Sequence, residues 1–442
     1  MLLASPRGVR ARQNAKDKER LLAVEIRLQR AARPRGKAKA SRRRLARAGR
    51  VGMPNGRSSG PAANAGKANL NGKPSAALRV VELFAGIGLV RLAVESRRWR
   101  VVFANDFDEQ KAAMYRANFA GDELHTGDVH AVRADEIPDC DLLTASFPCN
   151  DLSIAGAMAG LNGKQSGAFW AVVRLLRELG ERRPPVVLLE NVVGFLMSRR
   201  GRDFEAAMLA MNDLGYSCDA MILNAASFAP QSRQRLFVVA AMLPAEPPGV
   251  VTPSGARPQA LTDYINEHPR IGWRIRPLPE PPSRTAKLTD VLEDLPDDDP
   301  AWWNNERAGY FVNQLSERHS AVAAKMIAGA RYSYGTAFRR VRYGRSMAEL
   351  RTDGIAGCLR TPRGGSGRQI LFKAGRGRYM VRLMTARECA RLQGVPDSYK
   401  IDVPLNQALF GFGDAVCVPV VRWIIDNHLA AAAAEAMGAR QH

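Results

Sequence analysis

The sequence has few cysteines and no long apolar run. No apolar stretch reaches the roughly 18–20 residues of a membrane-spanning helix, and the first residues are not followed by the apolar segment of a signal peptide. The cysteines show neither the close spacing of a metal site nor that of a disulfide framework; they stand at positions 140, 149, 218, 358, 389 and 417. We therefore expect a cytoplasmic protein with no membrane segment, no metal and no disulfide.

Acidic residues are scarce in the first 75 positions. This segment holds 20 Lys and Arg but only Asp17, Glu19 and Glu25, so most of the formal net charge of +22 lies there. Such a tail is either a solvated, disordered extension or a sequence-blind contact to nucleic-acid phosphates. Met53, just before a stretch rich in Gly, Ser and Asn, is an alternative start.

With 46% hydrophobic residues, the rest of the chain can bury a substantial core. Short apolar runs alternate with amphipathic stretches from position 78 onward, which predicts an α/β fold with a Rossmann-like, parallel, doubly wound sheet. The predicted strands are 78–84, 101–105, 141–146, 186–190, 217–223 and 235–241. The predicted helices are 89–96, 109–118, 167–179 and 202–214.

The character of the sequence changes beyond Leu243. Pro-rich stretches and clustered aromatics without a dominant period predict an irregular domain, in which 317–330 is the clearest helix. Helices are expected again at 385–393 and from about 416 to 433. The predicted organisation is a basic tail 1–75, a catalytic domain 76–244, a second domain 245–375 and C-terminal helices 376–442 that return to the catalytic domain.

Glycines and acids follow the first strands. Phe84-Ala85-Gly86-Ile87-Gly88 stands where a tight turn approaches a ligand, although the motif alone also fits an ordinary turn. Asp106, about 20 residues later, can accept hydrogen bonds from ribose hydroxyls, and Phe107 can stack on an adenine. Asp128 after the next short segment can bind the adenine amino group. Three strand ends together predict a nucleoside cofactor.

A cysteine, an acid and two arginines follow later strands. Cys149 comes just after the strand 141–146, although a lone cysteine is more often an inert packing residue. Glu190 ends an apolar strand, where burial raises the pKa of a carboxyl group and lets it share a proton. Arg233 and Arg235 alternate into a strand, either as a surface salt-bridge row or as cationic clamps. Together these residues suit a nucleophile, an acid and two clamps.

The order of these motifs resembles that of the DNA (cytosine-5)-methyltransferase family, of the bacterial and phage type. The resemblance covers roughly 79–241 and 355–427, and six motifs in combination are highly specific. They are Phe84-Ala85-Gly86-Ile87-Gly88, Pro148-Cys149-Asn150, Glu190-Asn191-Val192, Gln231-Ser232-Arg233-Gln234-Arg235, Arg387-Glu388-Cys389-Ala390-Arg391-Leu392-Gln393-Gly394 and Gly413-Asp414-Ala415-Val416.

The resemblance implies transfer of a methyl group from S-adenosylmethionine to carbon 5 of a cytosine in double-stranded DNA. Cys149 would add to carbon 6 of a flipped-out base, Glu190 would hold ring nitrogen 3, and Arg235 with Arg233 would orient the base oxygen and Glu190. A glycine-containing loop, Ser153–Gly167, would close behind the base. The implied cofactor residues are Phe84, Ala85, Gly86, Ile87, Gly88, Asp106, Phe107, Asp128, Pro148, Asp414 and Val416.

The family's variable segment corresponds to 245–375 and would read the DNA sequence. Candidate readers of base edges are arginines, although each one is also consistent with phosphate contact; they are Arg339, Arg340, Arg342, Arg345, Arg360, Arg363 and Arg368. The sequence departs from the usual motifs at Leu89, Asn150, Gln165 and Asp414, of which none carries the core chemistry.

Three other functions fit parts of the sequence. An RNA cytosine methyltransferase shares the motifs, but the long variable segment favours DNA. A catalytically inactive DNA-binding protein would not need Cys149, Glu190, Arg233 and Arg235 together. A methyltransferase for small molecules or proteins leaves the pair Cys149 and Glu190 without a role. We expect a monomeric modification enzyme, with a cognate restriction endonuclease as a possible partner and an orphan or phage-borne enzyme as the alternative.

Overall fold

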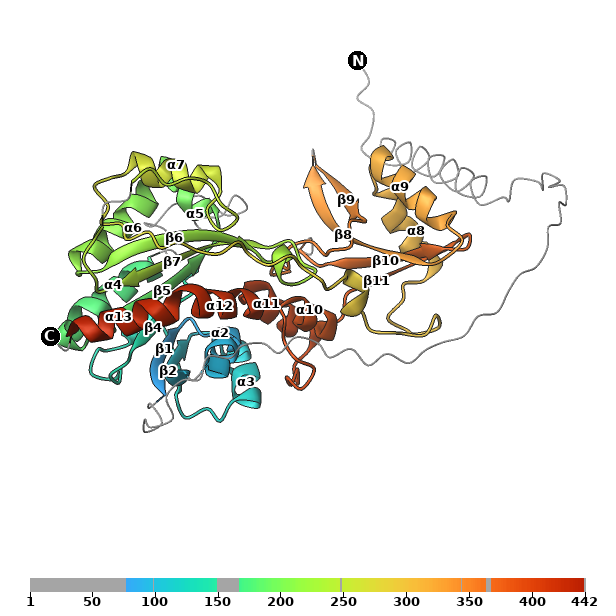
Figure 1. Ribbon diagram of the computed structural model, residues 1–442. Coiled ribbons are helices and arrows are strands. Elements are labelled where there is room, and N and C mark those ends of the chain that lie inside the picture. Colours follow the sequence, from blue (N-terminus) through green and yellow to red (C-terminus); the bar gives the residue numbers. More distant parts are fainter. Residues whose placement is uncertain are drawn as a thin grey trace, which may run out of the picture. The chain divides into compact units, whose positions relative to one another are not determined.

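Seven strands form the larger sheet of the computed structural model, which describes residues 77–97, 99–148, 167–246, 249–342, 344–362 and 367–440. The strand order is β3-β2-β1-β4-β5-β7-β6 (Figure 1). The strands are β1 (Leu78–Leu83), β2 (Trp99–Asp106), β3 (Leu124–Thr126), β4 (Leu142–Ala145), β5 (Val186–Asn191), β6 (Ser217–Asn224) and β7 (Gln234–Ala241). The predicted α/β class with a Rossmann-like sheet is confirmed.

The sheet is mixed rather than wholly parallel. Strands β1 to β5 pair in parallel, whereas β7 runs antiparallel to both β5 and β6. The expectation of an all-parallel sheet is therefore wrong for this edge. Only residues 225–233 join β6 to β7, and a parallel connection needs a crossover of a dozen residues or more.

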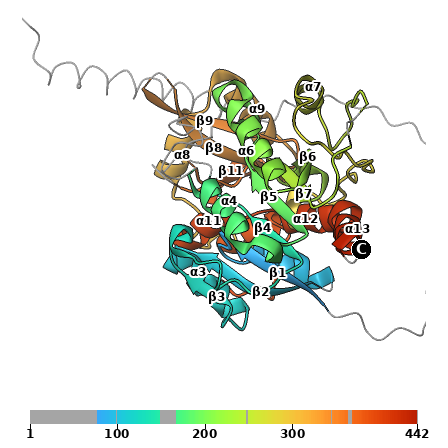
Figure 2. The ribbon, with the colours of Figure 1, turned by 90° about the vertical axis from the view of Figure 1, so that its left-hand side faces the viewer.

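Helices cover both faces of the larger sheet because its strands are apolar on both sides. Consecutive residues such as Val80 and Val81 point to opposite faces and pack in two different hydrophobic cores. One face carries α4 (Ala168–Leu179) and α6 (Arg202–Asp213), which lie in front of the sheet in Figure 2. The rest of that face is covered by α5 (Gly194–Met197) and α7 (Gln259–Glu267). The other face carries α2 (Leu89–Val94), α3 (Glu109–Asn118) and C-terminal helices.

A second, antiparallel sheet takes three strands from the segment 245–375, which was expected to be irregular, and one strand from the segment 376–442, where only helices were expected. Its strand order is β11-β10-β8-β9. Two helices, α8 (Asn305–Asn313) and α9 (Glu317–Ile327), precede its first strand in the chain. The strands are β8 (Ser333–Arg342), β9 (Arg345–Arg351), β10 (Ile370–Gly375) and β11 (Arg378–Leu383). Strand β8 contains Gly335 and three arginines, and none of the four strands has a clear apolar alternation, so the sequence pattern does not predict this sheet.

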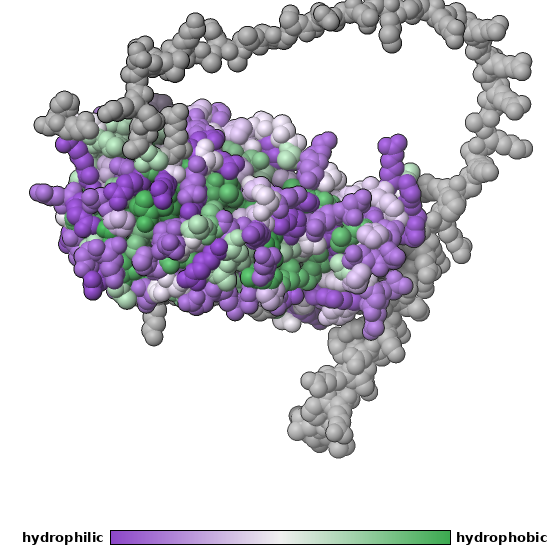
Figure 3. All heavy atoms as spheres, turned by 90° about the horizontal axis from the view of Figure 1, so that it is seen from below, coloured by the Kyte–Doolittle hydropathy of each residue, from purple (hydrophilic) through white to green (hydrophobic). Residues whose placement is uncertain are grey.

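The C-terminal segment contains α10 (Ala386–Leu392), α11 (Leu405–Asp414), α12 (Val418–Ile424) and α13 (Ala430–Arg440), with a π-helical turn between the last two. The stretch Leu405–Arg440 is long and apolar enough to cross a membrane, but 67% of its apolar window is buried in the molecule. Its apolar side chains pack against the larger sheet. Figure 3 shows hydrophobic residues in separate patches among hydrophilic ones on the face seen from below.

Candidate active site at the strand ends

The loop after β1 has an unusual backbone. Phe84, Gly86 and Gly88 have φ values of 60°, 57° and 78°, so three of five consecutive residues are left-handed. The Asp106 carboxylate at the end of β2 holds this loop, since it accepts hydrogen bonds from the Gly86 amide at 2.7 Å and the Asp108 amide at 2.9 Å. The predicted cofactor loop and the predicted ribose acid are therefore in direct contact.

Gly88 is required by close packing as well as by its φ. A Cβ at this position would lie 2.4 Å from Phe119 and 2.9 Å from Tyr115. These two rings contact each other with centroids 5.0 Å apart, so they cannot both yield easily. The second glycine of the motif thus lets α2 begin directly against α3.

The next strand ends present an aromatic ring and a second acid. Phe107 is 67% exposed although it is large and apolar, which leaves its ring free to stack on a planar ligand. The Asp128 side chain is also exposed and binds the backbone amide and ring of His130. Asn105 donates to the carbonyls of His125 and Gly127, which ties β2 to this loop.

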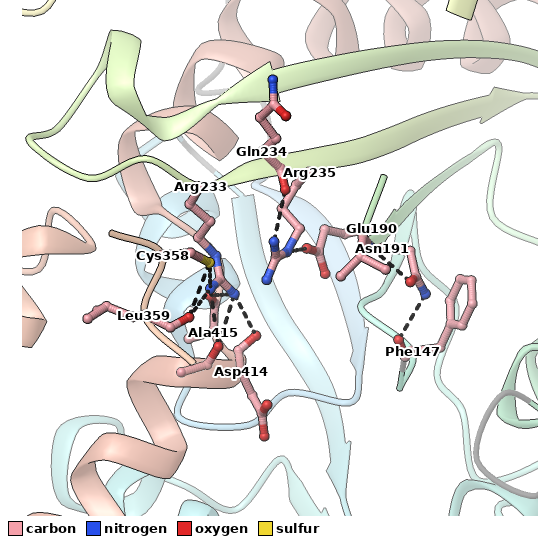
Figure 4. A network of polar contacts seen from close by, with 12 residues as sticks. Phe147, Glu190, Asn191, Arg233, Gln234, Arg235, Cys358, Leu359, Asp414 and Ala415 are labelled. Carbon is pink, nitrogen blue, oxygen red and sulfur yellow. Dashed lines mark hydrogen bonds and ion pairs between the residues drawn. The ribbon is translucent and has the colours of Figure 1, made fainter. Parts of the chain in front are cut away.

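Glu190 and Arg235 form the central ion pair of the candidate site, shown in Figure 4. Arg235 Nε lies 3.0 Å from Glu190 Oε1, and Glu190 is only 7% exposed. The two side chains meet because β5 and β7 are antiparallel: Glu190 pairs with Phe237, which puts Arg235 two residues along on the same face. If β7 were parallel to β5, its first residues, including Arg235, would lie at the other end of β5, away from Glu190.

The pKa of the Glu190 carboxyl is raised above its ordinary value. Burial is the main cause, and the charges of Arg235 and Arg233, together with a hydrogen bond from Ser146, oppose part of the rise. A buried carboxyl beside a guanidinium can therefore hold a proton and share it with a base nitrogen.

Asn191, next to Glu190, fixes the chain around the predicted nucleophile. Its side-chain amide donates to the Phe147 carbonyl at 3.1 Å, and its oxygen accepts from the Val192 amide. Pro148 follows Phe147, so this hydrogen bond sets where the chain leaves β4. Cys149 itself, with most of the predicted closing loop 153–167, lies outside the described residues.

Arg233 was expected to act with Arg235 on Glu190, but the structure places its guanidinium elsewhere. It donates to the carbonyls of Leu359 at 2.8 Å, Gly413 at 3.2 Å and Ala415 at 2.7 Å (Figure 4). The side chain is 2% exposed. Arg233 therefore reaches Glu190 only through its charge, while its hydrogen bonds join β7 to two distant segments.

Two buried glutamines, for which no role was predicted, extend this network. Gln231 donates to the Leu392 carbonyl and Gln393, and accepts from the Leu359 amide. Gln393 in turn donates to the carbonyls of Phe412 and Ala415. Both glutamines stand inside motifs of the family, which was the signal in the sequence that could have predicted a role for them. A buried side-chain amide needs hydrogen-bond partners, and here the partners are other motif segments.

The C-terminal motif lies beside the cofactor loop. Lys111 Nζ is 2.7 Å from Asp414 Oδ2, which ties α11 to α3, and Val416 is buried. The predicted cofactor residue Asp414 is thus held by a salt bridge to the helix that Asp108 caps. Among the residues that the structure describes, both predicted groups of cofactor residues belong to one region.

Cys358 differs from the packing residue that was expected. Its Sγ lies 3.6 Å from Arg233 Nη1, and the side chain is half-buried rather than enclosed. Burial tends to raise the pKa of this thiol, but Arg233, Arg235 and Arg360 outweigh burial, so the pKa is lowered. The cysteines at 140, 218, 389 and 417 are buried, as expected.

The candidate base-reading arginines have different surroundings. Arg339 and Arg307 both lie over the Trp303 ring, at 5.5 Å and 4.2 Å, while Arg340 lies over Phe338. Arg345 and Arg360 are exposed, and Arg368 donates to Asn406. The Arg342 side chain and Arg363 lie outside what the structure describes.

The sheet order, the strand-end acids and the buried pair of Glu190 and Arg235 together define a Rossmann-like fold with a charged site at one edge of its sheet. Comparison with known proteins gives the family. Residues 78–430 match the family model of the C-5 cytosine-specific DNA methylases. The chain belongs to this family, and it is a DNA (cytosine-5)-methyltransferase.

Relatives match along most of their length. Type II methyltransferase M.HhaI of Haemophilus parahaemolyticus is 30% identical over 357 residues, which cover 79% of this chain and 94% of that protein. Type II methyltransferase M.DsaV of Dactylococcopsis salina is 30% identical over 353 residues, covering 80% of this chain and 86% of that protein.

Solved structures share the fold at lower identity. A Dnmt2 mutant of Spodoptera frugiperda has a TM-score of 0.54 and 17% identity, covering 79% of this chain and 98% of that one. The Dnmt2 methyltransferase of S. pombe has a TM-score of 0.52 and 20% identity, covering 79% and 96%. At these identities the likeness supports the fold alone.

Proposed function

We propose that the enzyme transfers a methyl group from S-adenosylmethionine to carbon 5 of a cytosine within a specific double-stranded DNA sequence. The observation that carries the proposal is the buried pair of Glu190 and Arg235, with the raised pKa of Glu190, at the strand edge to which Pro148 leads. Family membership supports the reaction class.

The residues present fit S-adenosylmethionine. The left-handed loop Phe84–Gly88 leaves room for a close approach, Asp106 can accept from ribose hydroxyls in addition to the amides it holds, and Phe107 offers an exposed ring. Asp128 would accept from the adenine amino group, and Pro148, Asp414 and Val416 would complete the site. When bound, the cofactor supplies an electrophilic methyl group.

The target chemistry needs a nucleophile, because carbon 5 of cytosine is too weak to take a methyl group unaided. Cys149 adds as a thiolate to carbon 6, while Glu190 holds ring nitrogen 3 and shares a proton with it. Arg235 keeps Glu190 in place and orients the base oxygen. After methyl transfer, water acting as the base removes the carbon 5 proton, and Cys149 is expelled.

The cytosine must leave the duplex, because carbon 6 cannot be reached inside the stack, and unstacking costs a few kcal/mol. The loop 153–167 would close behind the flipped base. Residues 245–375 would form the target-recognition domain, with base readers among its arginines, beside the catalytic domain 76–244 and the returning helices 376–442.

The cellular setting follows from the same proposal. We assign a monomeric enzyme in the cytoplasm that modifies host DNA, beside a cognate restriction endonuclease or as an orphan. The basic segment 1–75 would add salt-sensitive affinity for DNA. The rival substrate, RNA, has no feature in the described residues that favours it over DNA.

Bisulfite sequencing tests the proposal. Plasmid DNA from cells that express the protein should carry methylated cytosines in one short sequence, and DNA from cells that express Cys149→Ser should carry none. Glu190→Gln should lower the rate constant of methylation by about 10²-fold or more, since one proton-sharing group is lost. Absence of methylation in both samples would exclude the DNA reaction and direct the assay to RNA.

A further inference from the structure

The turn that joins α5 to α6 has a strained backbone. Arg199 and Arg200 have φ values of 47° and 61°, and Gly201 follows at 83°. Left-handed conformations are unfavourable for an L-residue with a side chain, whereas glycine adopts them freely. Two consecutive arginines therefore occupy positions where glycine would be the low-energy choice.

The structure beneath the turn holds it in this conformation. The buried Ser198 hydroxyl donates to the buried Asp203 carboxylate at 2.5 Å, and the Tyr264 hydroxyl donates to the Gly201 carbonyl at 2.9 Å. A Cβ at Gly201 would lie 2.7 Å from the Tyr264 ring. Two hydrogen bonds thus hold the two ends of the turn, and the Tyr264 ring leaves no room for a side chain at Gly201, so the fold sets the shape of the turn.

The strained residues direct positive charge toward solvent. Arg199, Arg200 and Arg202 are exposed, and Arg199 approaches the buried Asp203 at 3.6 Å. The Arg200 guanidinium has no hydrogen bond or ion pair to another residue in the described part of the chain. Its side chain does not stabilise the fold, yet the strain at its backbone persists. Strain that the surroundings impose on a residue without an internal role points to a binding role.

The turn lies close to the reaction site along the chain. It follows β5 by only the short helix α5, and the nine residues from Glu190 to Arg199 span at most about 30 Å. A duplex whose cytosine reaches Glu190 carries phosphates within that distance on both sides of the target. Exposed guanidiniums are well suited to phosphate oxygens because they donate two parallel hydrogen bonds.

We propose that Arg199, Arg200 and Arg202, named here the arginine turn, contact the phosphate backbone of the DNA that flanks the target cytosine. The proposal rests on the proposed function for the identity of the DNA. The strained backbone aims the guanidiniums, and Tyr264, Ser198 and Asp203 act as positioning residues for the turn. Phosphate contacts of this kind add affinity but carry no sequence information.

The double variant Arg199→Gly/Arg200→Gly tests the proposal, because glycine removes both cations and also relieves the strain. We expect it to fold with unchanged or greater stability and to bind duplex DNA more weakly. The probe is a 30-base-pair duplex that contains the sequence found by bisulfite mapping, or a mixed-sequence duplex if none is found, at several salt concentrations. The slope of log Kd against log salt should fall by about 2, about 1 for each lost cation.

Two comparisons make the result specific. The variant should lose affinity by the same factor for target and scrambled duplexes, and its kcat at saturating DNA should match the wild type. Arg100→Gly, at an exposed position near the opposite edge of the sheet, is the matched control and should leave the salt slope unchanged. Wild-type affinity and slope in the double variant would overturn the arginine turn, whereas absent methylation by the wild type would overturn the proposed function instead.

Discussion

Replacement of Glu82 by Gln should change how stability depends on pH. Glu82 lies in β1 and is 1% exposed, and neither carboxylate oxygen has a hydrogen-bond partner within the described residues. Burial raises the pKa of this carboxyl from 4.5 to about 8, although the nearby Arg91 opposes part of the rise. Between pH 4.5 and about 8 the folded protein therefore holds a proton on Glu82 that the unfolded chain has released.

The sign follows from the direction of this shift. The pKa of Glu82 is higher in the folded state, so the stabilisation is fully present below pH 4.5 and is lost as pH rises through about 8. Each unit between these values costs about 1.4 kcal/mol, so the wild type should lose about 3–4 kcal/mol between pH 5 and pH 8 relative to Glu82→Gln. Glutamine keeps the shape of the side chain but cannot titrate.

Urea unfolding of both proteins at pH 5, 6, 7 and 8 measures this difference. Glu181→Gln, at an exposed position, reports the effect of losing one surface acid. If the free energies of unfolding of wild type and Glu82→Gln stay a constant distance apart over this range, Glu82 is not protonated in the folded state and the reasoning about its burial fails.

Three further perturbations follow from the contacts described above or from the buried core. Gly88→Ala should lower the free energy of unfolding by about 3 kcal/mol, because Cβ would meet the Phe119 ring at 2.4 Å in a left-handed residue; a melting temperature equal to wild type would contradict this. Asp219→Ala should cost about 3–5 kcal/mol in urea unfolding, since it leaves the buried Arg257, now 2.8 Å from the carboxylate, without a counter-charge. Iodoacetamide at pH 7 should modify Cys358 faster than Cys389, because the pKa of the Cys358 thiol is lowered and that of Cys389 is raised by burial; mass spectrometry showing equal rates would refute the assignment.

Local patterns predicted the elements of the larger sheet well. The helix expected at 109–118 is α3 to the residue, because Asp108 accepts hydrogen bonds from the amides of Gln110 and Lys111 and so marks its start. The strand bounds agree within two residues for β1 and β7. Elements with a strong apolar period or a capping residue are visible without tertiary information.

Pairing between distant segments was not visible. In the second sheet Ile370 of β10 pairs with Ala337 of β8, and neither strand has an alternation of apolar and polar residues that would predict this pairing. The sequence predicted Arg233 as a cation near an acid, but its hydrogen-bond partners are backbone carbonyl oxygens, such as that of Gly413. Every residue has a backbone carbonyl, so residue types cannot predict such a partner. Side-chain contacts to backbone groups leave no signature in residue types.

The position of α12 and α13 has a consequence for synthesis. Val418 and Ile424 of α12, with Ala432 of α13, pack in the same hydrophobic core as Val80 of β1 and Val90 of α2. That face of the sheet stays exposed on the ribosome until the last segment of the chain has emerged. The core on this face therefore cannot be completed until the segment 418–440 has been translated, and before that point the nascent chain exposes an apolar surface.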